Sequence, residues 1–404
     1  MKILLLNQAF YPDIVSTAQH LGELAAALAE KGHEVTVVSG RRAYDDPGKL
    51  FPAHEMWRGV RICRVFSTRF GKQAKWRRAA DFASFILSCC ARLLFLPRQD
   101  VVVALTTPPL ISCIGAWRAK LWRAKFCYWV MDLNPDEAVA AGWLRADSLA
   151  GMMLERWSRF SLRRADKIVA LDRFMRDRII AKGIAPGKIV VLPPWSQDHD
   201  VRFDAAGRER FRQAHGLQDK FVVMYSGNHS PVHPLGTLMQ AAERLKDEKS
   251  ITFCFIGGGS EFKRVRRWTE AGKRSNVLCL PYQPLAELSV SLSAADAHAI
   301  VMGDAMLGLV HPCKIYNVLA VGAPVIYIGP RPSHVTEILD QLGDEYPCIQ
   351  VAHGEADMLA NQIQNLRQKT PGGRRPLPTE VTAAFSKSVL LPELIGVLEG
   401  FQDE

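Results

Sequence analysis

Short apolar runs alternate with helical patterns along the whole chain, and this alternation constrains the fold more than any other feature. The first stretch has a buried strand at 2–6, a loop at 7–19, a helix from about 20 to 31 and a strand at 33–38. This order predicts a doubly wound parallel sheet, in which ligands bind beyond the carboxyl ends of the strands. The loop should therefore face a cleft, and because it lacks GxGxxG we do not expect a nicotinamide dinucleotide.

A chain of 404 residues is too long for one core and suits two domains. The same α/β rhythm resumes at 221–225, after the stiff polar segment PPWSQDHD at 193–200, which is typical of an interdomain hinge. We therefore place the first domain at 1–198 and the second at 199–380.

The net charge of +10 is concentrated in the first half, and between 57 and 98 Asp81 is the one acidic residue. Such a surface suits an anionic partner, either a phospholipid, a lipid pyrophosphate or a nucleic acid. Zinc-finger and RNP motifs are absent from the sequence, so we do not expect nucleic acid. Nine cysteines without metal-site spacing fit free thiols in a reducing compartment, and MKILLLNQAF fits a first strand better than a signal peptide. We expect a cytoplasmic protein.

The stretch 74–96 is basic at its start and rich in Phe, Leu and Ile. Asp81 and Arg92 argue against a transmembrane span. Two interpretations stay open. The stretch is a helix that lies in a membrane interface, with Lys72, Lys75, Arg77 and Arg78 near the headgroups, or a packing helix with a solvated basic end.

The segment GLVHPCKIYNVLAVGAPVI at 308–326 predicts a loop, a helix and a buried strand at 325–328. Pro312 suits the first helical turn and Gly322 the C-cap. Lys314 adds a positive charge at the helix N-terminus, where a phosphate would bind. The alternative is an ordinary αβ unit with one exposed lysine.

Glycine turns after strands, at 226–230 and 257–259, could bring backbone N–H groups to the same anion. In the first half, TTPP at 106–109 ends a strand, and Asp132 follows the strand at 126–131. A carboxylate there can orient a substrate, although helix capping explains it as well.

Seven segments keep one order along the chain: the loop at 7–19, TTPP, WVMDLNPDE at 129–137, VMYSGNHSPVHPLGTL at 223–238, FIGGGSEF at 255–262, NVLCLPYQPLAEL at 276–288 and PCKIYNVLAVGAPVI at 312–326. In this order they resemble the family 4 glycosyltransferases of the GT-B fold, and most closely the bacterial enzymes of surface-polysaccharide or glycolipid assembly.

The resemblance implies two Rossmann-like α/β domains that face a cleft, with a C-terminal helix at 381–404 that crosses back to the first domain. It implies retaining transfer of a sugar from a nucleoside-diphosphate donor, which we expect to be UDP-linked, to a saccharide or lipid-linked saccharide acceptor. No metal is expected. With the basic first domain, we expect the protein to lie peripherally on the anionic inner face of the plasma membrane.

The resemblance also implies site residues. For catalysis these are Asp132, Lys314 and His233. On the donor side they are Gly227, Asn228, His229, Gly257, Gly258, Gly259, Tyr282, Pro284, Lys314 and Asn317. On the acceptor side they are Ser16, Thr17, Gln19, Thr107 and Glu137.

Two departures from the family pattern matter. Asn228 and His233 stand where Arg and Lys are common, and Leu309 and Asn317 stand where two glutamates are common. His229 and His233 add charge only when protonated. A catalytically degenerate GT-B binding partner therefore stays open as an alternative. A sugar-nucleotide epimerase is a further alternative, although the acidic residues that it would need around the uridine diphosphate are not evident.

Overall fold

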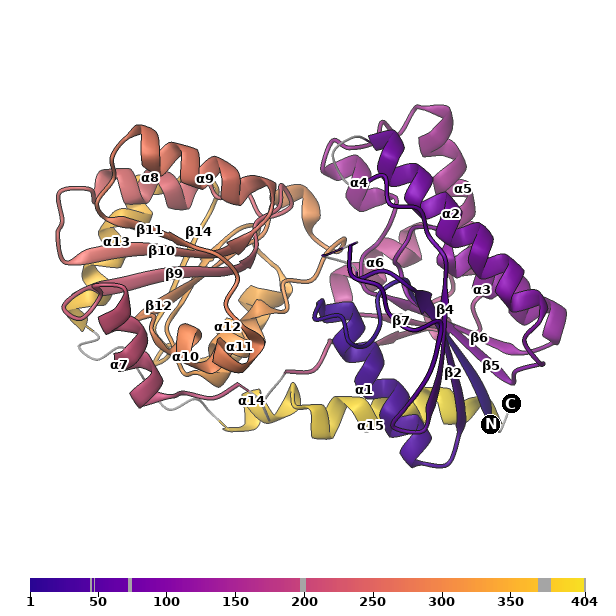
Figure 1. The fold of residues 1–404 in the computed structure, drawn as a ribbon. Coiled ribbons are helices and arrows are strands. Elements are labelled where there is room, and N and C mark those ends of the chain that lie inside the picture. Colours follow the sequence, from indigo (N-terminus) through magenta and orange to yellow (C-terminus); the bar gives the residue numbers. More distant parts are fainter. Residues whose placement is uncertain (44–45, 47, 72–74, 197–200, 370–378, 403–404) are drawn as a thin grey trace. The chain divides into compact units, whose positions relative to one another are not determined.

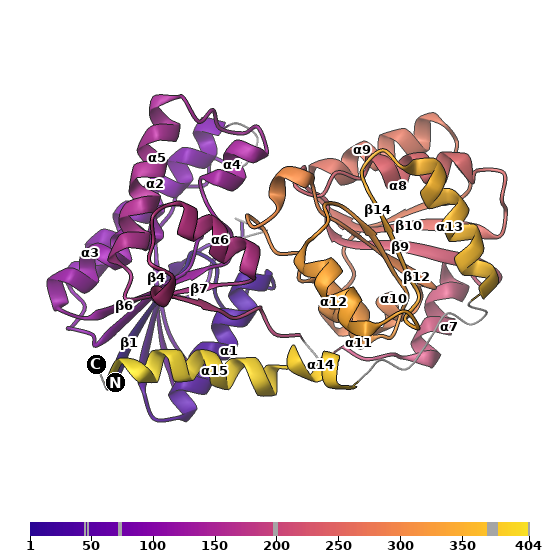
Figure 2. The ribbon, with the colours of Figure 1, turned by 180° about the vertical axis from the view of Figure 1, so that it is seen from behind.

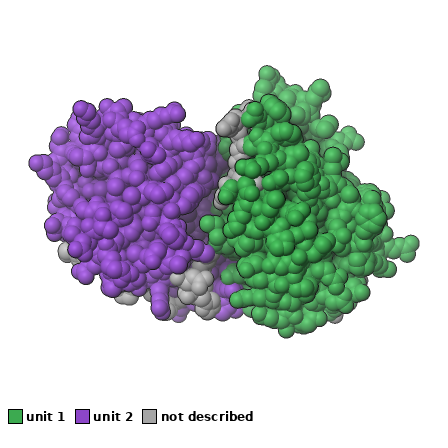
Figure 3. All heavy atoms as spheres, in the orientation of Figure 1, with its two compact units in different colours: residues 1–194, 308–311, 390–404 green, residues 195–307, 312–389 purple. Residues whose placement is uncertain are grey.

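The computed structural model describes residues 1–43, 46, 48–71, 75–196, 201–369 and 379–402. It divides the chain into two compact units (Figure 3). Unit 1 comprises Met1–Pro194, Gly308–His311 and Leu390–Glu404, and unit 2 comprises Trp195–Leu307 and Pro312–Val389. Residues 197–200 of the expected hinge and position 74 of the expected basic helix lie outside the described residues.

Unit 1 is built on an eight-stranded sheet of order β3-β4-β2-β1-β5-β6-β7-β8. Its strands are β1 (Lys2–Leu6), β2 (Glu34–Gly40), β3 (His54–Trp57), β4 (Val60–Val65), β5 (Val101–Ala104), β6 (Lys125–Val130), β7 (Lys167–Ala170) and β8 (Ile189–Val191). β1 lies between β2 and β5 and is parallel to both. Ile3 to Leu6 are completely buried because helices cover both faces of a parallel sheet, which is why this strand reads as an unbroken apolar run.

Helices of unit 1 lie on opposite faces of this sheet. They are α1 (Ser16–Glu30), α2 (Lys75–Leu94), α3 (Ile111–Trp122), α4 (Asp136–Ala140), α5 (Leu149–Arg164), α6 (Arg173–Ala181) and α15 (Lys387–Glu399). α2, α3 and α5 form one layer, and α1 and α15 lie on the other side (Figures 1 and 2).

The first helix was predicted to begin near residue 20, and this boundary was wrong. α1 begins at Ser16, because Ala18 and Leu21 already belong to its buried face. Ser and Thr at its start suggested a loop, although the same residues are common in a first helical turn.

The edge strand β3 was not predicted. It pairs antiparallel with β4 through a two-residue turn, in which Arg58 and Gly59 both have positive φ. Such a turn matches the twist of the two strands, and its Arg-Gly sequence is a weaker signal than the common Asn-Gly.

Unit 2 has a six-stranded parallel sheet of order β11-β10-β9-β12-β13-β14. Its strands are β9 (Phe221–Asn228), β10 (Ile251–Gly258), β11 (Val277–Leu280), β12 (Ala297–Val301), β13 (Val325–Ile328) and β14 (Cys348–Val351). Its helices are α7 (Ala205–Ala214), α8 (Gly236–Arg244), α9 (Ser260–Ala271), α10 (Leu288–Ser293), α11 (Lys314–Ala320), α12 (His334–Leu342), α13 (Ala356–Lys369) and α14 (Thr379–Ala384). These two α/β sheets match the predicted fold class.

The C-terminal helix α15 contributes to the core of unit 1. Leu394 and Leu398 are buried, and Glu399 accepts hydrogen bonds from Lys31 at 3.1 Å and from His33 at 3.0 Å. Among the described residues, Glu380–Gln402 is the one helical segment long and apolar enough to cross a membrane. A helix that packs into a protein core meets the same criteria.

A buried ionic cluster joins α7 to the sheet of unit 2. Asp296 accepts hydrogen bonds from Arg212 at 3.0 Å, from Arg208 at 2.5 Å and from the backbone N–H of Val222 at 2.7 Å. The side chains of Asp296 and Arg212 are almost completely buried. Removing the carboxylate charge would leave two guanidinium groups buried without their counterion.

We therefore expect Asp296→Asn to lower the free energy of unfolding by about 3 kcal/mol. Asp357→Asn is the matched control in the same unit, because Asp357 pairs with Arg244 at the surface and its side chain is 78% exposed. The control should cost less than about 1 kcal/mol. Urea unfolding followed by circular dichroism measures both variants. Equal losses in the free energy of unfolding would contradict a larger contribution of the buried cluster to stability.

Candidate active site

The strand order of unit 2 reverses beside β9. The chain passes from β9 to β10 and β11 on one side, whereas β12, β13 and β14 extend the sheet on the other. The carboxyl ends of β9 and β12 therefore flank a topological switch point, where open α/β sheets bind ligands. The predicted glycine turns, both histidines and Lys314 all come from segments that end or begin near this edge.

Two glycines allow the ends of β9 and β10 to meet. Gly227 and Gly257 are paired in the sheet, and their φ angles are +119° and +139°. A Cβ atom on Gly257 would lie 2.0 Å from the carbonyl oxygen of Gly227. Next to them, a Cβ atom on Gly258 would lie 2.9 Å from the ring of Tyr282, and the backbone O of Gly258 accepts from the N–H of His229 at 2.8 Å. The turns at 226–230 and 257–259 thus form one continuous structure.

Lys314 lies against this structure. Its Nζ atom is 3.7 Å from the ring centroid of Tyr225 and 3.5 Å from the backbone O of Asn228. A Cβ atom on Gly227 would come within 2.8 Å of its Cε atom. Burial lowers the pKa of Lys314 to about 7. Tyr225 was not singled out from the sequence as a candidate, since a tyrosine in a buried strand is indistinguishable from an ordinary core residue.

The helix that was expected to begin at Pro312 begins at Lys314 and has seven residues. Pro312 precedes the N-cap residue Cys313, and the contact from Ile315 N–H to the Pro312 carbonyl is long, at 3.5 Å. The first turn is therefore too open to count as helix. Gly322 ends the segment with φ +65°, as predicted.

Both histidines are neutral at pH 7 in this structure. His229 Nδ1 donates to the carbonyl oxygen of Gly227 at 2.8 Å, and burial and the charge of Lys314 lower its pKa to about 4. His233 Nδ1 donates to the carbonyl oxygen of Val301 at 2.7 Å, and the same two causes lower its pKa to about 3. The His229 Nε2 atom is buried and has no hydrogen-bond partner among the described residues.

The remaining donor-side residues lie in different surroundings. Asn317 is half-buried on α11, one turn after Lys314. Tyr282 is exposed and lies over Gly258. Pro284 is exposed at the start of a short 3-10 turn. A Cβ atom on Gly259 would lie 2.9 Å from the side-chain oxygen of Asn228, which places these two residues in contact.

In unit 1, two carboxyl groups follow β6. Asp132 lies at the carboxyl end of the strand, and Glu137 is in the first turn of α4. Burial raises the pKa of both groups, and the Asp132 charge raises that of Glu137 further. Asn134 donates to Glu137 Oε2 at 3.3 Å. Asp132 does not cap the following helix α4, whose N-cap residue is Pro135 and which has no side-chain cap.

Other acceptor-side residues make mainly local bonds. Ser16 is exposed, and its Oγ lies 3.3 Å from His20 Nδ1 within the first turn of α1. Gln19 donates to the carbonyl oxygen of Ile14 at 2.9 Å, and Thr17 is half-buried beside it. The carbonyl oxygen of Thr107 accepts from the N–H of Gln8 at 2.8 Å, which joins the loops that follow β5 and β1.

Leu309 belongs to unit 1 and lies in its core. Its carbonyl oxygen accepts from the N–H of Leu133 at 2.8 Å, directly after Asp132. Near it, His311 Nδ1 and Asp172 Oδ2 are 2.8 Å apart in a buried pair. This pair was not predicted, because Asp172 reads in the sequence only as a helix start and its partner is 139 residues away.

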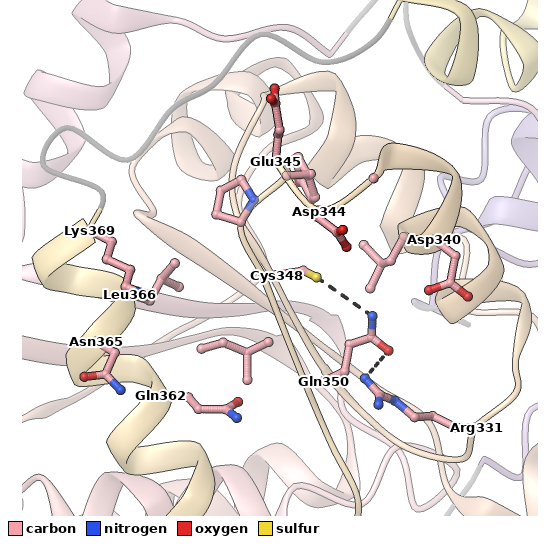
Figure 4. Close-up of a pocket in the computed structure, with 15 residues that line it drawn as sticks. Arg331, Asp340, Asp344, Glu345, Cys348, Gln350, Gln362, Asn365, Leu366 and Lys369 are labelled. Atoms are coloured by element: carbon pink, nitrogen blue, oxygen red, sulfur yellow. Dashed lines mark hydrogen bonds between the residues drawn. The ribbon is translucent and has the colours of Figure 1, made fainter.

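A polar cavity of about 780 Å³ opens along β14, between α12 and α13 (Figure 4). Its lining includes Arg331, Gln350 and Lys369, and Gln350 lies between Arg331 and Cys348. None of the predicted site residues lines it. Lys369 is the last described residue before 370–378, so we assign no ligand to this cavity.

Both halves of the chain match glycosyltransferase family models. Residues 17–195 match the glycosyl transferase 4-like domain, and residues 207–368 match glycosyl transferases group 1. A relative in Escherichia coli (strain K12), WcaI, named for colanic acid biosynthesis as a glycosyl transferase, is 26% identical over 91% of this chain and 92% of its own.

Solved structures show the same fold over nearly the whole chain. Anabaena HepE, in complex with UDP and glucose, is similar with a TM-score of 0.73 at 16% identity, and covers 99% of both chains. Sucrose-phosphate synthase from Thermosynechococcus elongatus is similar with a TM-score of 0.76 at 14% identity, over 100% of both chains. The chain belongs to the GT-B glycosyltransferases, with a glycosyl transferase 4-like first half and a group 1 second half.

Proposed function

We propose that this enzyme transfers a sugar, with retention of configuration, from a UDP-sugar to a lipid-linked saccharide in surface-polysaccharide assembly. The observation that carries the proposal is Lys314, a cation held on the Tyr225 ring at the switch point of unit 2. The names of two similar proteins support it, since HepE was solved with UDP and glucose and WcaI is named for colanic acid biosynthesis.

Unit 2 would bind the donor. Lys314 would neutralise the diphosphate as it leaves, which is the main electrostatic demand of the reaction. Because Gly227 and Gly257 carry no side chains, the backbone of the turn can approach the phosphates closely. Gly258, Gly259, Asn228, Tyr282, Pro284 and Asn317 would complete the donor side.

The two neutral histidines would act as hydrogen-bond acceptors in this site. Each uses its Nδ1–H group on a backbone carbonyl, so its Nε2 atom carries a lone pair. We propose that His229 Nε2 accepts from a donor hydroxyl, because it is buried without a partner among the described residues. His233 would hold the same role beside the reacting sugar.

Unit 1 would present the acceptor, with Asp132 nearest the attacking hydroxyl. In a retaining front-face reaction, the bond from the sugar C1 to the phosphate oxygen breaks as the bond from C1 to the acceptor oxygen forms, and the leaving phosphate takes the hydroxyl proton. Asp132 need only orient that hydroxyl and need not take its proton. The raised pKa of the Asp132 carboxyl group is compatible with this role. Glu137, Thr107, Ser16, Thr17 and Gln19 would line the acceptor side.

A degenerate binding partner is the second candidate, and one observation favours it. Leu309 stands where the family commonly has a glutamate, and it is buried in unit 1. A thermal-shift screen against UDP, GDP, ADP and dTDP tests the nucleotide site directly. A ligand at about a hundred times its Kd stabilises by about 2.7 kcal/mol, and the absence of any shift would favour the degenerate partner.

We also propose that the enzyme works in the cytoplasm at the inner face of the plasma membrane. The basic first half supports an anionic surface as its partner, since α2 begins with Lys75, Arg77 and Arg78. A lipid-linked acceptor would be met there.

We expect the affinity for UDP-glucose to fall as the pH rises above about 7. The diphosphate favours the ammonium form of Lys314, so binding raises its pKa from the value of about 7 in the free enzyme. Below that value the amine is already charged and Kd is constant, and above it Kd rises by up to about tenfold per pH unit until the pKa of the complex is reached. Calorimetric titration across neutral and mildly alkaline pH measures this slope.

Lys314→Arg is the matched control, because a guanidinium stays charged throughout this range and should remove the pH dependence. Lys314→Gln should bind weakly at every pH. An unchanged slope in the arginine variant would assign the titration to another group.

We expect Asp132→Asn to lower kcat by about ten- to a hundredfold while Kd for the UDP-sugar changes by less than about twofold. An amide keeps the shape but orients a hydroxyl less strongly than a carboxylate. UDP release from a panel of UDP-sugars, with membrane extract as the acceptor source, measures kcat. Asp147→Asn, at an exposed position, is the control. Equal losses of kcat and of affinity would give Asp132 a structural role instead.

A further inference from the structure

Helix α2 exposes an apolar stripe along its outer face. Exposed apolar side chains recur there at helical spacing, with Arg78 exposed beside them, and they are Trp76, Ala79, Ala83, Leu87, Ala91 and Leu94. Leu87 is 70% exposed and Leu94 is 59% exposed. A surface helix normally turns charged side chains outward, so this stripe is the reverse of the usual pattern.

Helix α5 repeats the pattern beside it. Leu149, Met153, Trp157 and Phe160 follow one another at helical spacing, and all are exposed. α3 contacts both helices and exposes Trp117. Three neighbouring helices of one layer thus share an apolar outer face (Figures 1 and 2).

The three helices enclose an open groove of about 770 Å³. Eight of its nine lining residues are apolar, among them Leu94, Ile114, Trp117, Trp157 and Phe160, and Arg156 is the ninth. A groove of this composition suits a hydrocarbon chain, with a cation at its edge for an anionic headgroup.

The charge of these helices is strongly one-sided. They carry ten Lys and Arg residues against the carboxylates Asp81 and Glu155, so they supply +8 of the chain's net +10. Both carboxylates are engaged. Asp81 accepts from Thr68 at 2.7 Å and Glu155 binds Lys182 at 2.8 Å. Arg78, Lys120 and Arg156 are exposed on these helices, so the helices that carry the apolar face also expose positive charge.

We propose that this face docks on an anionic lipid bilayer, and that its groove holds an acyl chain of a phospholipid. The stripes extend along both helices beyond the groove, so a single acceptor chain would leave most of the apolar surface exposed. Docking of a second copy of the chain on this face is disfavoured, because it would bring two positively charged surfaces together. The inference deepens the proposed function, because a lipid-linked acceptor is presented at such a surface.

Co-sedimentation of the full chain with phosphatidylcholine vesicles, with and without phosphatidylglycerol, tests the docking. We expect binding that requires phosphatidylglycerol and falls with salt. Met153→Ser should lower the partition coefficient about five- to tenfold, because it removes an apolar contact that docking would bury. Met358→Ser is the matched control, since this exposed methionine lies on α13 of unit 2 and should change nothing.

Quenching by phosphatidylglycerol with brominated acyl chains tests the groove itself. We expect the tryptophan fluorescence of the bound enzyme to be quenched. In a Trp76→Phe background, which removes the exposed stripe tryptophan outside the groove, the Trp117→Phe, Trp157→Phe double variant should keep vesicle binding within about twofold and lose most of the remaining quenching, because phenylalanine preserves the apolar surface. Quenching that is unchanged in the double variant would overturn the groove as the chain site.

Further outcomes would overturn either the docking proposal or the assignment of the groove. Vesicle binding that is independent of phosphatidylglycerol, or that is unaffected by Met153→Ser, would exclude this face as the docking surface. Dimers in sedimentation velocity that Met153→Ser abolishes would make it an interface between copies. If the binding of monomeric dodecyl phosphate depends on Trp157 while vesicle binding does not, the groove would be assigned to the acceptor chain. UDP binding in solution should be equal in all variants, so a failure of the donor site is distinguishable from a failure of docking.

Discussion

The close approach of β9 and β10 at their carboxyl ends is the constraint on which the rest of the proposed donor site depends. No side chain fits at Gly257, because its Cβ atom would lie 2.0 Å from the Gly227 carbonyl oxygen. The same carbonyl accepts from His229 Nδ1, and Gly227 leaves the space that the Lys314 side chain occupies. The absence of side chains at Gly227 and Gly257 thus allows the packing that fixes the tautomer of His229 and the position of Lys314.

This packing also decides where charge resides. The two histidines are held neutral by burial and by Lys314, and Lys314 in turn loses part of its preference for the charged form. Because the histidines are neutral and Lys314 loses its proton easily, there is little electrostatic repulsion among these three side chains without a bound anion. The diphosphate of the proposed donor would supply the missing countercharge, so its binding would be coupled to protonation of Lys314.

The features that could be predicted from the sequence are those that local patterns and the family's order of motifs determine. The α/β class, the strand at 325–328 and the positive φ of Gly322 are consequences of apolar runs, glycine and proline. The predicted starts of helices were less accurate, as α1 and α11 show, because Ser, Thr and Pro are common both in loops and in first helical turns. The contact of Lys314 with Tyr225 and the Asp172–His311 pair could not be predicted, since each depends on how distant segments pack.

The apolar stripes of α2 and α5 show a second limit of pattern analysis. Helical periodicity marks one buried face, yet both helices carry apolar residues on the buried face and on the exposed one. From sequence alone this is indistinguishable from a helix buried on all sides, so the packing helix and the interfacial helix both stayed open. The structure separates the two faces. Phe85, Cys89 and Leu93 are buried in unit 1, whereas Leu87 and Leu94 remain in contact with solvent. An apolar surface on helices with a large excess of positive charge gains free energy where water gives way to hydrocarbon beside negative charge, and an anionic bilayer interface offers both.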